Sequence, residues 1–246
     1  MSKIAIIGGT DLCELKNLKT TRREHRTTPY GLSSAPLSYG TLHGKHVVFI
    51  ARHGDEYTIP PHKINYRANI WALKDAGVDR IISISIVGGI RSDMTPGRFV
   101  IPDQLIDYTH LREHTFFDGQ DQMIHHIDFR LPFSENLRQV LMSAANDLDL
   151  DPSDEAVYGV VEGPRLQTTA EINRMEKEGC DIVGLTLMPE ASLAREVNID
   201  YACLAIVAGR ASGRENSAFS IDVIGKVYQE SRENVHSLLQ QVIHDL

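Results

Sequence analysis

The stretch Ile4-Ala5-Ile6-Ile7-Gly8-Gly9-Thr10 opens the fold, because four consecutive apolar residues run directly into two glycines and a threonine. A short apolar run that ends at glycine is typical of a strand buried in a parallel sheet. The glycines then permit a tight turn in which backbone N–H groups and a threonine hydroxyl can meet an anion. Taken alone, such a segment is more often a structural turn than a binding loop.

The spacing of these glycines excludes the common nucleotide-binding fingerprints. A GxGxxG motif needs glycine at 8 and 10 or at 9 and 11, but position 10 holds Thr10 and position 11 holds Asp11. The chain also contains no GxxxxGK[ST] sequence. Asp11 tolerates a left-handed backbone better than most residues, so the turn is expected to form and to suit a small anion.

Apolar runs alternate with helical patterns along the rest of the chain, which predicts one α/β domain over residues 1–246. Further strands are expected at 46–51, 80–87, 157–161, 181–185 and 201–207. Helices are expected at 64–77 and from about residue 220. The apolar face of the second helix carries Val235, Leu238, Leu239 and Val242.

Composition narrows the class of protein. The net charge of -8 argues against a general nucleic-acid binder, which needs Lys and Arg to displace counterions. Cys13, Cys180 and Cys203 are far apart and form no CxxC pair, so neither a disulfide framework nor a metal site is expected. No apolar run reaches membrane-spanning length, and residues 1–4 show no signal-peptide pattern. We therefore expect a cytoplasmic protein with no nucleic-acid or membrane partner.

Five residues that could contact an anion follow predicted strands, where open α/β sheets bind ligands: Thr10, Arg52, His53, Ser85 and Thr186. The guanidinium of Arg52 is a planar donor matched to phosphate oxygens. An isolated Arg-His pair after a strand is more often a solvated surface pair. As an exposed strand-end residue, Arg52 is expected to be replaceable by Ala with loss of phosphate binding and no damage to the fold.

Several motifs resemble, in order, those of the purine nucleoside phosphorylase / methylthioadenosine phosphorylase family: Gly8-Gly9-Thr10, Ala51-Arg52-His53-Gly54, the run from Asn65 to Leu73, Glu162-Gly163-Pro164-Arg165, and Thr186-Leu187-Met188-Pro189-Glu190. The resemblance implies a mixed central β-sheet flanked by helices and a homotrimer. It implies phosphate-dependent cleavage of the N-glycosidic bond of a purine nucleoside, giving free purine and (methylthio)ribose 1-phosphate. Inorganic phosphate is then a co-substrate, and no metal or other cofactor is implied.

The resemblance also assigns residues to subsites. The phosphate residues would be Thr10, Arg52, His53, Ser85, Ile86 and Thr186, with Arg52 and His53 also catalytic. Leu185, Leu166 and His126 would contact the ribose and its 5′ substituent. His126 would reach the site of a neighbouring subunit, although a solvated loop histidine is the alternative interpretation.

The expected base pocket departs from the family pattern at Gln167, Gly209, Arg210, Ala211 and Ile221. Family members that take 6-oxopurines have Glu and Asn at the positions of Gln167 and Gly209, whereas those that take 6-aminopurines have an Asp pair. The segments 87–90 and 107–109 look most like methylthioinosine phosphorylases. S-methyl-5'-thioinosine or another 6-oxopurine nucleoside is therefore the expected substrate.

Two alternatives remain open at this stage. S-methyl-5'-thioadenosine is disfavoured as substrate by the missing Asp pair. A catalytically weakened nucleoside- or phosphate-binding homologue would combine an intact phosphate set with an altered base pocket. The sequence does not identify the donor to the leaving purine; Arg210, Ser212, Arg214 and Asn216 are the candidates.

Overall fold

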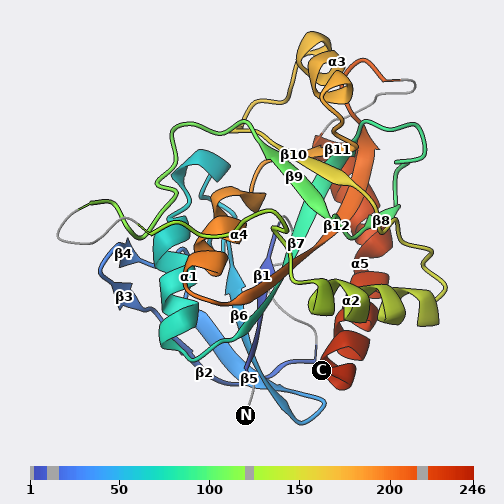
Figure 1. The fold of residues 1–246 in the computed structure, drawn as a ribbon. Coiled ribbons are helices and arrows are strands. Elements are labelled where there is room, and N and C mark those ends of the chain that lie inside the picture. Colours follow the sequence, from blue (N-terminus) through green and yellow to red (C-terminus); the bar gives the residue numbers. More distant parts are fainter. Residues whose placement is uncertain (1–2, 10–16, 120–124, 215–220) are drawn as a thin grey trace.

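A computed structural model describes residues 3–9, 17–119, 125–214 and 221–246, and it shows a central twisted sheet between helices (Figure 1). Within these residues ten strands form one mixed sheet, whose main path runs β2-β5-β6-β1-β7-β11-β10-β9. Its strands are β1 (Ile4–Gly8), β2 (Lys19–Glu24), β5 (Leu37–Leu42), β6 (Lys45–Ala51), β7 (Arg80–Gly89), β8 (Phe99–Val100), β9 (Gln104–Asp107), β10 (Val157–Val160), β11 (Ile182–Gly184) and β12 (Asp200–Arg210). A separate pair consists of β3 (Thr27–Thr28) and β4 (Gly31–Leu32).

The centre of the sheet is parallel. Strand β1 lies between β6 and β7, and all five of its residues are buried, as the apolar run predicts. Strand β12 also pairs in parallel with β7, whereas β11 pairs with β7 in the antiparallel sense. The expected α/β fold class with a mixed sheet is therefore confirmed.

Helices cover both faces of this sheet (Figure 1). Helix α1 (Tyr66–Asp75) packs against α4 (Leu187–Glu196), and α2 (Glu135–Asp147) packs against α5 (Ile221–Asp245). Helix α3 (Thr169–Lys177) begins at a capping box and lies at one end of the molecule, and a single 3₁₀ turn, η1, spans Pro61–Lys63. The apolar face expected for the last helix is fully buried at Val235, Leu238, Leu239 and Val242.

One strand is longer than its sequence suggests. Strand β7 continues past residue 87 because Gly88 and Gly89 pair with Gly209 and Arg210 of β12. Ser85 lies inside β7, as it does within the expected strand 80–87, so the expectation that it follows a strand end is wrong. Strand β11 ends at Gly184, and Thr186 occupies the N-cap position of α4.

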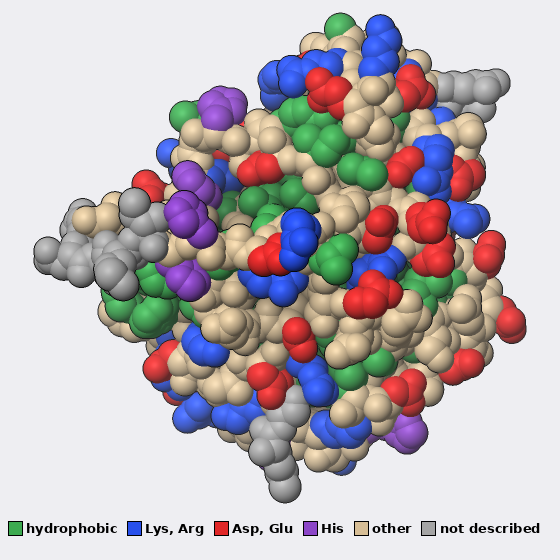
Figure 2. Space-filling model, viewed as in Figure 1, with side chains coloured by type: hydrophobic (Ala, Val, Ile, Leu, Met, Phe, Trp, Pro, Cys, Tyr) green, Lys and Arg blue, Asp and Glu red, His purple; other side chains and the backbone are tan. Residues whose placement is uncertain are grey.

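None of the helices within the described ranges is long and apolar enough to cross a membrane. The same residues contain no cluster of three or more His, Cys, Asp or Glu side chains arranged to hold a metal ion. The face shown in Figure 2 intermixes acidic and basic side chains and has no continuous basic stretch.

Candidate active site

A small cavity lies where β1, β6 and the segment before α4 come together. Its volume is ≈50 Å³, several times the roughly 10–15 Å³ that one water needs. The lining residues include five of the six predicted phosphate residues: Arg52, His53, Ser85, Ile86 and Thr186. Leu185 also lines it. Thr10, the sixth predicted residue, lies outside the described residues.

Arg52 is held from several sides by other buried groups. Its Nε and Nη2 donate to the two carboxylate oxygens of Glu190, each at 2.7 Å. Nη2 also donates to Ser83 Oγ at 2.6 Å, and Nη1 to the Ile84 carbonyl at 3.2 Å. A guanidinium has five N–H donors, so one Nη1 hydrogen has no acceptor among the described residues. That hydrogen belongs to a side chain that lines the cavity.

The burial of Arg52 overturns one expectation from the sequence. Its side chain is 0% exposed, as is that of its partner Glu190, and His53 is also buried, so Arg52 and His53 are not a solvated surface pair. Although burial opposes the charge, Glu190 raises the pKa of the Arg52 guanidinium above its ordinary value. The expectation that Arg52 is an exposed strand-end residue is therefore wrong. Because removing Arg52 would leave a buried carboxylate without its counterion, we expect Arg52→Ala to lower stability as well as phosphate binding.

His53 is neutral in this environment. Its Nδ1 lies 2.8 Å from the carbonyl oxygen of Ile59, which can only accept, so Nδ1 carries the hydrogen. Burial, followed by the charge of Arg52, lowers the pKa of His53 to about 4. The Tyr57 ring lies 4.8 Å from the imidazole and lines the same cavity.

Two hydroxyls in the cavity are available for a ligand. Ser85 Oγ is buried and has no hydrogen-bond partner among the described residues. Thr186 is also buried, and its side chain does not cap α4 although it stands at the N-cap position. Glycine at position 9 lets the chain pass close to Ile84 and Arg52, since a Cβ there would lie 2.5 Å from the Ile84 carbonyl oxygen and 3.4 Å from Arg52 Nη1.

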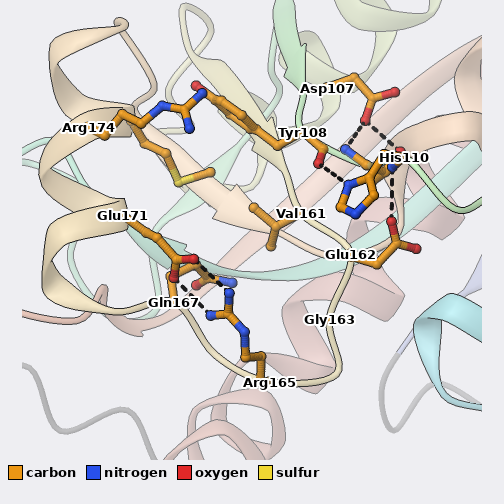
Figure 3. Close-up of a pocket in the computed structure, with 12 residues that line it drawn as sticks. Asp107, Tyr108, His110, Val161, Glu162, Gly163, Arg165, Gln167, Glu171 and Arg174 are labelled. Carbon is orange, nitrogen blue, oxygen red and sulfur yellow. Dashed lines mark hydrogen bonds and ion pairs between the residues drawn. The ribbon is translucent and has the colours of Figure 1, made fainter.

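A second, larger cavity of ≈510 Å³ opens between β9, the segment after β10, and α3. Figure 3 shows Gln167 beside the Arg165–Glu171 ion pair, with Glu162 and His110 on the other side of the cavity. The Glu171 carboxylate accepts hydrogen bonds from Nη1 and Nη2 of Arg165 and from the backbone N–H of Thr168. These contacts lower the pKa of Glu171 to about 2. Of the predicted base-pocket residues whose side chains the structure describes, only Gln167 lines this cavity.

The remaining base-pocket and substrate residues are more scattered. Gly209 pairs with Gly88 beside a β-bulge in β12. Ala211 is buried in an apolar cluster with Ile90, Ile172, Met175, Cys180 and Val183. Leu166 and His126 are exposed, and the side chain of Ile221 lies outside the described residues.

Two of the candidate donors to the purine are engaged elsewhere. The Arg210 guanidinium donates to the carbonyls of Ile90, Arg91 and Met94, and Arg210 lines neither cavity. Arg214 contacts Asn173 and Glu176 of α3. Arg210 therefore stabilises the neighbouring backbone, and Arg214 stabilises a contact with α3. The candidate Asn216 lies outside the described residues.

Sequence reasoning missed the groups that hold the site residues in place. Glu190, Ser83 and Tyr201 surround Arg52, and Tyr201 Oη donates to Glu190 Oε1 at 2.8 Å. Glu190 stands inside a motif that the sequence analysis quoted, but only the fold brings it to Arg52, 138 residues away along the chain. Arg112 carried no sequence signal, yet it is one of the few buried arginines.

Comparison with known proteins agrees with this architecture. The sequence pattern of the Phosphorylase superfamily matches residues 3–244. The chain therefore belongs to the phosphorylase superfamily, and the predicted membership of the purine nucleoside phosphorylase family of enzymes is confirmed.

Individual relatives extend over nearly the whole chain. It is 44% identical over 243 residues to a probable S-methyl-5'-thioinosine phosphorylase of Pseudomonas syringae pv. tomato, covering 99% of both chains. It is 40% identical over 248 residues to a 6-oxopurine nucleoside phosphorylase of Pyrococcus furiosus, covering 99% of this chain and 92% of the relative. The solved methylthioadenosine phosphorylase of Schistosoma mansoni in complex with adenine matches with a TM-score of 0.94 and 32% identity, over 99% of this chain and 91% of that one.

Proposed function

We propose that the protein cleaves S-methyl-5'-thioinosine, or another 6-oxopurine nucleoside, with inorganic phosphate to give free purine and (methylthio)ribose 1-phosphate. The observation that carries this proposal is the small cavity, where a guanidinium, an imidazole and two hydroxyls converge within a phosphorylase fold. The names of the relatives from Pseudomonas syringae and Pyrococcus furiosus support a 6-oxopurine substrate.

In this reaction the bond between the ribose anomeric carbon and the purine nitrogen breaks as a phosphate oxygen bonds to that carbon. The bonding electron pair leaves with the purine, which takes up a proton or hydrogen bond at its imidazole nitrogen. Phosphate held beside the ribose stabilises the oxocarbenium-like charge that develops on the sugar, so positioning and electrostatics supply most of the rate.

We assign phosphate to Arg52, His53, Ser85, Thr186 and the backbone at Ile86, together with Thr10. Arg52 is well suited to this role because Glu190 and Ser83 fix its plane before the ligand arrives. Leu185 lines the same cavity and is assigned to the ribose. Leu166 is assigned to the substrate as well, and Gln167 lines the larger cavity, which is assigned to the nucleoside.

We further propose that the chain acts as one domain over residues 1–246, in a cytoplasmic homotrimer whose neighbouring subunit supplies His126. His126 is exposed in the single chain, as expected if its ligand lies in another subunit. Two large apolar side chains, Leu111 and Leu131, are 77% and 65% exposed, and such side chains are frequent at interfaces.

A panel of nucleosides tests the substrate. Phosphate-dependent release of purine is followed by absorbance for methylthioinosine, inosine, methylthioadenosine and adenosine. Faster release from the 6-oxopurine nucleosides is expected. Preference for methylthioadenosine would replace the proposed substrate by the 6-aminopurine alternative, and binding without release from any nucleoside would favour a weakened homologue.

A further inference from the structure

Arg112 lines neither cavity but contacts residues that line both, and its whole guanidinium is hydrogen-bonded to protein groups. Nη2 donates to the carbonyls of Leu185 and Glu162, at 2.7 and 2.8 Å, and more weakly to that of Val161 at 3.3 Å. Nη1 donates to the carbonyl of Met188 and to Tyr66 Oη. Nε donates to Glu162 Oε1 at 3.0 Å. All five N–H donors therefore have protein acceptors, so Arg112 has none left for a ligand.

These acceptors belong to segments that are far apart in sequence. Leu185 lines the small cavity and Met188 follows Thr186 at the start of α4. Glu162 and Val161 line the large cavity and precede the loop that carries Leu166 and Gln167. Tyr66 begins α1. One side chain, itself 2% exposed, thus ties backbone that lines the small cavity to backbone that lines the large one.

Glu162 completes the arrangement from the opposite side of Arg112. Its Oε2 accepts the backbone N–H of His110 at 3.1 Å and of Leu111 at 3.4 Å, which tie the segment before Arg112 to the large cavity. Burial alone would raise the pKa of the Glu162 carboxyl, but the His110 N–H and Arg112 lower it below its ordinary value. The ionised pair is thus the stable form.

We propose that Arg112 and Glu162 are positioning residues that set the separation between bound phosphate and bound nucleoside. This inference rests on the proposed function. A shift of about 1 Å between reacting groups can cost ~10² in rate, so a pair that fixes two binding segments to each other has a large effect without touching either substrate.

The chain offers a matched control elsewhere in the fold. Arg138 of α2 is also a buried arginine that donates to carbonyls, those of Ile101, Pro102 and Asp154, and pairs with Glu135. It lines neither cavity. Arg112→Met and Arg138→Met therefore remove the same kind of buried guanidinium, once between the cavities and once away from them.

The experiment measures kcat and both KM values for these variants, with phosphate affinity by calorimetry. Arg112→Met should lower kcat about 100-fold and alter the KM of phosphate and of nucleoside, because both segments move. Arg112→Lys should not rescue it, since a single ammonium cannot reach all these acceptors. Glu162→Gln should lower kcat less, and the double variant should be no worse than Arg112→Met alone. Arg138→Met should lower thermal stability with kcat and both KM values unchanged.

The inference is overturned if folded Arg112→Met keeps wild-type kinetics, or if Arg138→Met loses kcat by the same factor. Should Arg112→Met fail to fold, Glu162→Gln decides, and unchanged kinetics in that variant overturn the inference. Failure of the proposed function gives a different pattern, in which the wild type itself releases no purine. In that case, loss of calorimetric phosphate affinity in Arg112→Met supports the positioning of the Leu185–Met188 segment, and unchanged affinity overturns it.

Discussion

The guanidinium of Arg52 and the carboxylate of Glu190 meet side by side through two hydrogen bonds of 2.7 Å, and neither side chain reaches solvent. Such a pair is costly to desolvate, so its burial is not by itself a source of stability. Here the carboxylate fixes the plane of the guanidinium and leaves one Nη1 hydrogen for the cavity. Phosphate bound at the proposed site would therefore meet a donor that needs no reorientation.

This pair predicts that stability and function can be separated. Arg52→Met should lower the free energy of unfolding by about 3–5 kcal/mol, because Glu190 is left buried without its counterion. Arg52→Met combined with Glu190→Met should recover most of that loss, while phosphorolysis stays absent in both variants. Urea denaturation and calorimetric titration with phosphate measure the two effects.

A surface ion pair supplies the control for this cycle. Arg130 and Asp128 are 88% and 61% exposed, and Arg130→Met should change neither stability nor phosphate affinity measurably. A folded Arg52→Met variant with wild-type phosphate affinity would remove Arg52 from the proposed phosphate site.

His53 predicts a pH dependence of stability. Its pKa is lowered to about 4 in the fold, so between that value and about 6.5 the unfolded chain binds more protons than the native one. The stability that depends on neutral His53 is therefore fully present above pH 6.5 and is lost as the pH falls toward 4. The loss in the free energy of unfolding is on the order of 3 kcal/mol. His53→Asn keeps a donor for the Ile59 carbonyl and should flatten this part of the curve; an unchanged slope would show that another group titrates there.

The central sheet could be predicted from the sequence because it depends on local pattern. A continuous apolar run predicts strand β1, and an apolar stripe at helical spacing predicts the last helix. The extension of β7 through Gly88 and Gly89 could not be predicted, since it depends on pairing with Gly209 and Arg210 more than a hundred residues later. Short strands such as β8 carry too few residues for any periodicity.

The candidate site likewise combines features that the local sequence predicts with features that depend on distant parts of the chain. Arg52 and His53 could be located from their place after a strand, whereas the burial of Arg52 depends on Glu190 and Ser83, which arrive from other elements. Arg210 was a reasonable donor by charge alone, but its guanidinium is occupied by three backbone carbonyls that only the folded chain brings together. Sequence indicates which groups are present, and packing decides which of them remain available.

The proposed assembly predicts a particle of three 27.5 kDa chains by light scattering. His126→Ala should leave this mass unchanged and raise the KM of the nucleoside severalfold, with the KM of phosphate unaffected, because the side chain would reach a neighbour's 5′ pocket. His125→Ala is the matched control, since the His125 ring packs at a tilt against Phe117 of its own chain, with ring centroids 4.8 Å apart. A monomer mass at micromolar concentration would contradict both the assembly and the role of His126.

The base pocket predicts slow turnover with weak discrimination among purines. The Gln167 amide both donates and accepts, whereas the carboxylate usual in 6-oxopurine enzymes only accepts, so Gln167 favours the N1–H of hypoxanthine less strongly. Gly209 offers no side chain to the leaving purine. Its backbone is outside the left-handed region, so an Asn at this position needs no strained backbone conformation.

Gln167→Glu combined with Gly209→Asn should therefore raise kcat for inosine or methylthioinosine, by up to ~10², and raise it less for the adenine counterparts. The gain should appear in the rate at saturation, because a donor to the leaving group acts in the transition state. Gly209→Ala adds a side chain without an amide and should give no gain, which makes it the control. A wild-type enzyme that is already fast and selective, or a double variant without any gain, would show that other residues hold the purine.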